Sequence, residues 1–361
     1  MKYYFLLLLA FSLFSTSAFA YPEMIRQNYA NCIACHESPS GGGLLNPYGR
    51  GISTELLSTW GTAAEAKPFY GAIDKPYLKK WFNAGGDLRG LLFHSKSSES
   101  TQDEFMKMQA GIETAFKYQK FKFVSFFGKQ ISSEVLKGEF LRFYLQYQMM
   151  DQLTIRAGRF IPNFGINIAE HIFATRRGLG FEQGNERNQI EAMWSGEKWN
   201  YSMTFSKEVS ESTRVNQEKA ASAQVNFTFL DSYRVGGDLW LGDLNGVTRQ
   251  ILGAHALLGF NKKFYYLTEF DFQNGFDNKN GLFHFSKLGY EIIKGVHVLA
   301  IEDYQKSNLN NGLTLSNSYG LGAQWYPRPH FDFEGIWSKK RIAFQSSEYF
   351  DYAYLMMHYY F

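Results

Sequence analysis

The sequence predicts an all-β fold: a transmembrane antiparallel β-barrel of about 16 strands, preceded by a small N-terminal α-helical segment. Three observations predict it. Short stretches alternate apolar and polar residues through most of the 361-residue chain, aromatic residues make up 18% of it, and an apolar N-terminal stretch has the pattern of a secretory signal. Serial alternation with period two is typical of barrels in the outer membrane, which is the location we expect.

The first twenty residues (1–20) predict export from the cytoplasm. Lys2 gives a positive start, residues 5–14 are almost wholly apolar, and Ala18-Phe19-Ala20 is a small-residue cleavage site. We expect a mature chain that begins at Tyr21. The apolar run is short against the about 20 residues of a membrane-spanning helix, so a retained anchor is the weaker alternative.

The predicted barrel occupies residues 84–361. Residues 141–149 show the pattern, because Leu141, Phe143, Leu145, Tyr147 and Met149 share one face and Arg142, Tyr144, Gln146 and Gln148 the other. One face suits lipid and the other a wet interior. We expect strands near 84–95, 104–118, 120–131, 138–150, 152–160, 188–196, 198–207, 218–230, 231–242, 248–260, 262–273, 281–293, 295–305, 314–326, 329–339 and 349–361.

Two alternatives to this arrangement stay open. The hydrophilic segments around 207–218 and 306–314 hide or split a strand if the true number is 14 or 18. A soluble β-sandwich is the other alternative, although more proline than the 8 residues present would then be expected. The ending Tyr359-Tyr360-Phe361 favours the barrel, because it resembles the aromatic last strand of outer-membrane proteins.

Both cysteines of the chain lie in one motif, Cys32-Ile33-Ala34-Cys35-His36. This C-x-x-C-H spacing is that of a c-type haem attachment site. We therefore expect one covalent haem c, bound through thioethers to Cys32 and Cys35, with His36 as the proximal iron ligand. A redox dithiol or half of a zinc site is the weaker alternative, because no second cysteine pair exists.

Residues 21–83 form the predicted haem-binding segment, which is too short to bury much surface alone. We expect it to plug the barrel, with a short helix from Pro22, a turn at 38–43 and a second helix at 53–60. The distal haem ligand is Met24, His94 or an open site. Arg26 and Arg50 are candidate partners of the haem propionates, with a solvated surface charge as the alternative for each.

The alternation stops between residues 159 and 187, where charged residues gather in a glycine-punctuated loop: Arg159, Arg176, Arg177, Arg187, Glu170, Glu182, Glu186 and His171. This loop resembles the folded-in constriction loop of general porins. A solvated extracellular loop is the equal alternative, and a metal site at His171 is a weak one. The formal net charge of +3, which falls to +2 without Lys2, gives no case for nucleic acid as a partner.

A signal, one C-x-x-C-H motif and a barrel together resemble the fused outer-membrane monohaem cytochrome c–porins, including members from iron-oxidising bacteria. The resemblance covers the architecture and rests on Cys32, Cys35 and His36. It implies a haem held in the barrel, reduced by an extracellular donor such as Fe(II) and reoxidised by a periplasmic c-type cytochrome or another carrier. Outer-membrane lipids are implied partners, and a homo-oligomer is an option because many porins form one.

An outer-membrane electron conduit is thus the function that the sequence predicts. Direction of electron flow is not encoded. Two alternatives stay open: a diffusion porin whose haem supports the plug, and a haem enzyme or ligand sensor with an open iron site.

Overall fold

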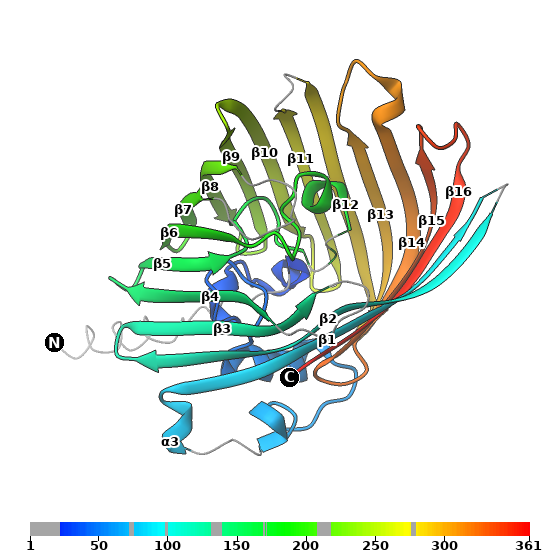
Figure 1. The fold of residues 1–361 in the computed structure, drawn as a ribbon. Helices are drawn as coiled ribbons and strands as arrows, with labels where there is room; N and C mark the ends of the chain where they lie inside the picture. Colours follow the sequence, from blue (N-terminus) through cyan, green and yellow to red (C-terminus); the bar gives the residue numbers. More distant parts are fainter. Residues whose placement is uncertain are drawn as a thin grey trace.

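The chain forms a closed antiparallel barrel (Figure 1). The computed structural model describes residues 22–71, 76–97, 100–130, 139–168, 170, 172–207, 218–275 and 279–361. In this part of the chain each strand pairs with its sequence neighbours, and β1 pairs with β16. The all-β barrel and its 16 strands are therefore confirmed. The predicted signal, residues 1–20, lies outside the described residues.

The strands follow the predicted segments closely. They are β1 (Phe82–Lys96), β2 (Thr101–Tyr118), β3 (Phe121–Gln130), β4 (Glu139–Gln148), β5 (Leu153–Phe160), β6 (Arg187–Ser195), β7 (Trp199–Lys207), β8 (Lys219–Phe229), β9 (Tyr233–Leu244), β10 (Val247–Gly259), β11 (Phe264–Asn274), β12 (Asn280–Ile293), β13 (Val296–Lys306), β14 (Leu315–Trp325), β15 (Phe331–Ile342) and β16 (Phe350–Tyr360).

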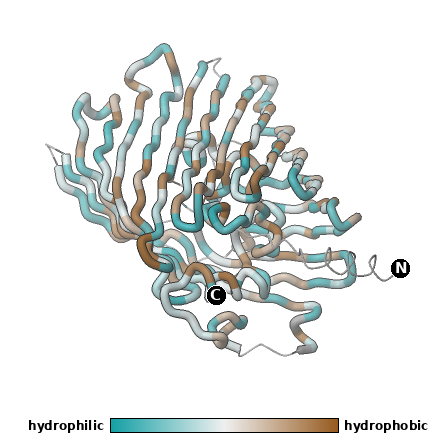
Figure 2. The backbone as a smooth tube through the Cα atoms, turned by 180° about the vertical axis from the view of Figure 1, so that it is seen from behind, coloured by the Kyte–Doolittle hydropathy of each residue, from teal (hydrophilic) through white to brown (hydrophobic). Residues whose placement is uncertain are grey.

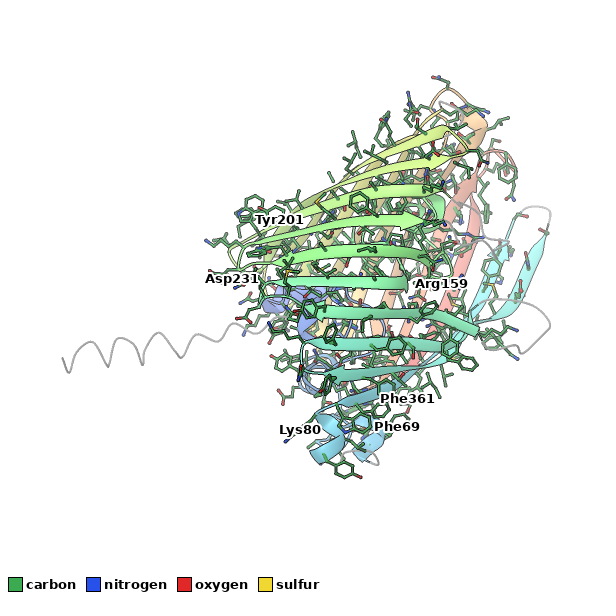
Figure 3. The ribbon with its side chains drawn as sticks, turned by 60° about the vertical axis from the view of Figure 1, so that its left-hand side comes forward. Phe69, Lys80, Arg159, Tyr201, Asp231 and Phe361 are labelled. Carbon is green, nitrogen blue, oxygen red and sulfur yellow. The ribbon has the colours of Figure 1, made fainter. Side chains whose placement is uncertain are left out.

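The wall is apolar outside and polar inside, the reverse of a soluble protein. Along β7 the exposed side chains are Trp199, Tyr201, Met203 and Phe205, and the buried ones are Asn200, Ser202, Thr204 and Ser206. Figure 2 shows this alternation of apolar and polar residues along the strands, and Figure 3 shows Tyr201 pointing away from the barrel. An outward apolar face fits lipid, so the structure favours the membrane barrel over the soluble sandwich.

Strands β1 and β2 are longer than predicted, because β1 ends later, at Lys96, and β2 begins earlier, at Thr101. The segment 101–104 is exposed on both faces and carries Gln102, Asp103 and Glu104. A strand with polar residues on both faces has no period-two signal, which explains the missed residues. The hairpin projects beyond the neighbouring strands in Figure 1.

The two ends of the barrel differ in their connections. One end has seven turns of two to five residues, such as residues 119–120 and 230–232, whereas the other carries the 26-residue connection between β5 and β6. Figure 3 shows Asp231, in a short turn, and Arg159, near the start of the long connection, at opposite ends. Because short turns face the periplasm in outer-membrane barrels, we name the first end the periplasmic end.

The N-terminal segment consists of short helical pieces: η1 (Pro22–Gln27), η2 (Cys32–Ala34), α2 (Pro47–Ile52), η3 (Ser53–Leu57), η4 (Pro68–Gly71) and α3 (Pro76–Lys79). The predicted helix at Pro22 is present. The predicted helix at 53–60 starts earlier and ends at Leu57, because the Asn46 side chain accepts from the Gly49 amide and caps a helix with Pro47 in its first turn. No described helix is long and apolar enough to cross a membrane.

The first half of this segment lies inside the barrel, near its periplasmic end (Figure 1). Its backbone and side chains bond to several strands and turns. Thr59 and Trp60 donate their amides to the carbonyls of Tyr326 and Pro327 in the turn after β14, and the Tyr326 hydroxyl donates to Glu23 at 3.1 Å. At the same end Phe69 packs on the C-terminal Phe361, with ring centroids 4.9 Å apart (Figure 3).

Candidate functional site

The C-x-x-C-H motif forms one tight turn. The amides of Cys35 and His36 both donate to the Cys32 carbonyl at 3.2 Å, which places the two thiols about one helical turn apart. Both cysteines are free of disulfide bonds. Cys35 is buried at 4% exposure, whereas Cys32 is partly open to a cavity. Burial raises the pKa of the Cys32 thiol, and nearby Arg234 opposes that rise.

His36 is oriented by the backbone. Its Nδ1 lies 3.1 Å from the carbonyl oxygen of Gly43. Because a carbonyl only accepts, Nδ1 carries the proton of the neutral ring, which assigns the lone pair to Nε2. Metal-bound histidines are commonly held in this way, with the second ring nitrogen donating to a carbonyl or carboxylate. The geometry of His36 therefore fits an axial ligand.

Helix α2 packs directly on the motif. The Asn46 side chain donates to the Ala34 carbonyl at 2.6 Å, and the Asn46 amide donates to the Cys35 carbonyl at 2.7 Å. A Cβ on Gly49 would lie 2.4 Å from that Cys35 oxygen and 2.9 Å from the Cys35 Cα. Glycine is therefore required at this position, and the motif has a fixed support.

The chain next to His36 is tied to the barrel wall by charge. Glu37 pairs with Lys117 at 2.7 Å and with Lys122 at 3.0 Å, and it accepts from Asn83 at 2.8 Å. Burial by itself would raise the pKa of the Glu37 carboxyl, but Lys122 and Lys117 outweigh it and hold that pKa below its ordinary value. The motif is thus positioned by β1, β2 and β3.

Arg26 and Arg50, the predicted propionate partners, bind the wall. Arg26 pairs with Glu291 at 2.6 Å and donates to the Lys262 carbonyl. Arg50 donates to the Asn83 side chain and to the Ala84 carbonyl, each at 2.8 Å. Both side chains are buried, and neither is among the described residues that line the cavity at Cys32. The structure gives both arginines a role in joining the segment to the barrel.

The structure brings one of the two predicted distal ligands close to the motif. Met24, 1% exposed, shares an apolar cluster with Cys35, Leu45 and Tyr326. His94 is half-exposed and lies 2.7 Å from Asp103 across the β1–β2 hairpin. The N-terminal segment contacts β1 at Ala84, whose carbonyl accepts from Arg50. His94 is ten residues further along β1, or about 33 Å of extended strand, so the fold does not place it near Cys32.

The cavity that Cys32 opens onto measures about 820 Å³, including space open to solvent. Its lining comes from the N-terminal segment, from the connection between β5 and β6, and from β6 to β10, and includes Tyr29, Asn31, Asn167, Asn200, Arg234 and His255. The two thiols, which form no disulfide, and the oriented imidazole fit a covalently attached haem. Cys32 lines the cavity, whereas Cys35 and His36 are buried and are not among its lining residues.

The wall residues of this cavity were missed by the sequence analysis. Asn200, Arg234 and His255 each occupy an inward position of an alternating strand, but so do many other polar residues. Which of these face Cys32 depends on pairing between strands and on how the segment enters the barrel. The inward alternation was the one available signal, and it could not choose among them.

The long connection, residues 161–186, folds into the barrel (Figure 1). The amide of Ile166 donates to Glu269 at 2.7 Å and that of Gly165 donates to Asp238 at 3.0 Å, while Phe164, Phe173 and Phe181 are buried. The structure thus has the inward-folded loop rather than the solvated one. Asn167 donates to the Ser40 carbonyl at 3.1 Å, so the loop also contacts the N-terminal segment.

The predicted charges of this loop are dispersed among several partners. Lys287 of β12 binds Glu170, Arg187 pairs with Glu218 at 3.2 Å, and Arg176 donates to the Phe164 carbonyl at 2.6 Å. His171 lies outside the described residues. Among the residues that are described, no group of three or more histidine, cysteine, aspartate or glutamate side chains could hold a metal ion.

No protein-family model and no curated protein sequence matches the chain. Solved structures do. OprB of Pseudomonas putida matches with a TM-score of 0.62 at 8% identity, over 85% of this chain and 99% of that one. OmpF of Salmonella typhi matches with a TM-score of 0.58 at 11% identity, over 78% and 97%, and the outer-membrane channel DcaP of Acinetobacter baumannii with 0.56 at 13%, also over 78% and 97%.

Identities this low show the fold alone. The matched structures are covered almost completely, whereas about a fifth of this chain has no counterpart in OmpF or DcaP. That share is about the length of the chain before β1. The chain therefore has the barrel fold of outer-membrane porins, which supports an outer-membrane location, together with an added N-terminal segment.

Proposed function

We propose that this protein is an outer-membrane electron-transfer protein in which one haem c, attached to Cys32 and Cys35, connects periplasmic and extracellular redox partners. The observation that carries the proposal is the C-x-x-C-H motif inside a barrel, with His36 Nδ1 bonded to the Gly43 carbonyl. This bond prepares Nε2 for iron, as hydrogen bonds to the second ring nitrogen do in metal sites.

The residues of the chain have distinct roles in this proposal. Cys32 and Cys35 hold the ring covalently, and His36 is the proximal ligand. Met24 is the better placed of the two predicted distal ligands, because it packs in the apolar cluster of Cys35. When bound, the haem supplies a one-electron couple whose potential is set by its axial ligands and surroundings.

The barrel would position the haem between the two compartments. A bilayer separates the two compartments by about 30 Å of hydrocarbon, and the exposed apolar side chains of the strands fit that layer. The N-terminal segment bonds to the turns at the periplasmic end, including Tyr326 and Pro327. A periplasmic c-type cytochrome or another carrier would meet the protein at this end, and an extracellular partner, such as Fe(II), at the loop end.

A diffusion porin with a structural haem plug is the second candidate. The fold comparison favours it more directly than electron transfer, because the matched structures include the outer-membrane channel DcaP and an anion-selective porin from Comamonas acidovorans, the second at 10% identity and a TM-score of 0.56. Against open diffusion, residues 161–186 and the N-terminal segment both occupy the lumen and contact each other through Asn167 and Ser40.

Proteoliposomes separate the two candidates. Vesicles would enclose a soluble c-type cytochrome, and a charged reductant would be added outside. Electron transfer through haem predicts rapid reduction of the enclosed cytochrome by the wild type and none by the double variant Cys32→Ser, Cys35→Ser, whose barrel is unaltered. Equal reduction by both proteins, with matching ion conductance in planar bilayers, would show that the reductant simply diffuses through and would establish the porin.

A further inference from the structure

The wall of the Cys32 cavity contains one continuous polar row. Asn200 of β7 is paired with Asn226 of β8, Asn226 with Gly236 of β9, and Gly236 with His255 of β10. Neighbouring strands lie about 4.8 Å apart, so these positions form a strip across four strands. Arg234 is two residues from Gly236 and therefore on the same inward face.

Glycine at position 236 makes this strip flat. A Cβ there would lie 2.3 Å from His255 Nε2 and 2.5 Å from Asn226 Oδ1. The His255 ring instead reaches across Gly236 and contacts Asn226 Oδ1 through Nε2 at 2.7 Å, while its Nδ1 contacts Asp238 at 2.7 Å. His255 thus fixes Asn226 and the wall behind the cavity.

Arg234 differs from the other buried arginines of the wall. The other five buried arginines of the described strands each have a carboxylate within 4.0 Å: Arg89, Arg142, Arg156, Arg187 and Arg249. Arg234 has none within the described part of the chain, although it is only 8% exposed. Its side chain donates to two neutral groups, Asn31 Oδ1 and Thr228 Oγ1. A buried cation without a counter-charge is costly, and such groups are normally paired.

Asn200 is the second unmatched group of the strip. It is 9% exposed and lines the same cavity, yet neither its amide nitrogen nor its amide oxygen has a hydrogen-bond partner. A buried polar atom that makes no hydrogen bond is costly, because it has lost its bonds to water. A cation without an anion and an amide without an acceptor, facing one cavity, are complementary to a carboxylate.

We propose that Arg234 and Asn200 form a carboxylate site for the propionates of the haem attached at Cys32. The inference rests on the proposed haem and assigns its anchors to the barrel wall, in place of Arg26 and Arg50. The Arg234 guanidinium would pair with the carboxylate, a charge-assisted contact about twice as strong as a neutral hydrogen bond, and the Asn200 amide would donate to it. Arg234 and Asn200 are positioning residues, since they set the surroundings of the iron without binding it.

The test is a redox titration of the purified, haem-loaded protein and its variants. Loss of a positive charge near the haem favours the oxidised state. At the midpoint potential of the wild type, the ratio of oxidised to reduced haem should therefore rise on the order of tenfold in Arg234→Gln. Arg234→Lys, which keeps the charge, should restore most of the wild-type ratio, and Asn200→Ala should shift it in the same direction as Arg234→Gln but less.

The matched control is Arg89→Gln, a lumen arginine of β1 that contacts Asp87 and His358 and does not line the cavity. It should leave the ratio unchanged. An unchanged ratio in Arg234→Gln with haem present would overturn the inference and leave the proposed function standing. If the ratio is unchanged in Arg234→Gln, and succinate blocks the ion current of the wild type but not that of this variant, the site binds dissolved carboxylates instead. A wild-type protein without haem would overturn both proposals.

Discussion

At the scale of single residues, packing on the C-x-x-C-H motif depends on a glycine that has no side chain. Gly49 and Gly51 lie in the same short helix, α2. A Cβ on Gly49 would meet the Cys35 oxygen at 2.4 Å, whereas a Cβ on Gly51 would meet nothing within 4 Å. The two positions therefore separate close packing on the motif from the general effect of glycine in a helix.

We expect Gly49→Ala to displace α2 from the motif, at a cost of about 1–3 kcal/mol in docking of the N-terminal segment. It should lower the number of haem groups attached per chain and increase cleavage of the segment by protease. Gly51→Ala is the control, and alanine should stabilise the helix there by about 0.5–1 kcal/mol. Equal haem content and equal protease resistance in both variants would contradict the proposed packing.

Residue roles were only partly predictable from the sequence. The positions of Cys32, Cys35 and His36 in one turn follow from their spacing, which is local. The wall partners of Arg26 and Arg50 lie more than 30 residues away, on β12 and β1, and no local pattern names them. For the same reason Arg234 and Asn200 could not be distinguished from other inward polar residues before the strands were paired.

At the scale of elements, Lys287 of β12 joins the inward loop to the wall. Its ammonium binds Glu170 of the loop and Glu334 of β15, the second at 3.0 Å, and all three side chains are buried. A buried ion pair that loses one partner typically costs about 3–5 kcal/mol, because the remaining charge is unpaired. Lys287 is therefore the residue whose loss should free the loop most effectively.

We expect Lys287→Met to lower the free energy of unfolding by about 3–5 kcal/mol and to raise single-channel conductance, since Glu170 of the loop then loses its cationic partner on β12. Lys339→Met is the control. Lys339 pairs with Asp351 at 2.9 Å, but these side chains are 49% and 34% exposed, and such pairs contribute about 0–1 kcal/mol. Similar conductance and similar unfolding midpoints in the two variants would show that the Lys287 cluster does not hold the loop.

The elements themselves were largely predictable, because strand identity is encoded by a period of two over about ten residues. All 16 predicted segments overlap observed strands. The element boundaries that differ from the prediction have local causes: residues 101–104 are exposed on both faces, and the second helix begins at the cap that Asn46 and Pro47 provide. The inward course of residues 161–186 could be matched to a known loop type, but its partners Asp238 and Glu269 follow only from the closed barrel.

At the scale of the whole molecule, the barrel and the N-terminal segment are one folding unit in physical terms. The segment is too small to form a core of its own. Its charged and polar groups bind partners on the wall, as Glu37 binds Lys117 and Lys122. The interior of the barrel therefore replaces the core that a separate haem domain would need. A porin fold alone explains the wall; it does not explain two cysteines without a disulfide and an oriented histidine inside it.

Whether this segment carries haem c is tested most directly by a pyridine haemochrome spectrum of the purified protein after denaturation. We expect one haem per chain in the wild type, and this haem should stay attached in denaturant. We expect no attached haem in Cys35→Ala, while heat-dependent gel mobility shows that the barrel of that variant still folds. A wild-type protein that folds as a barrel in a host able to attach haem c, yet carries no covalent haem, would exclude the haem protein and leave the porin as the better description.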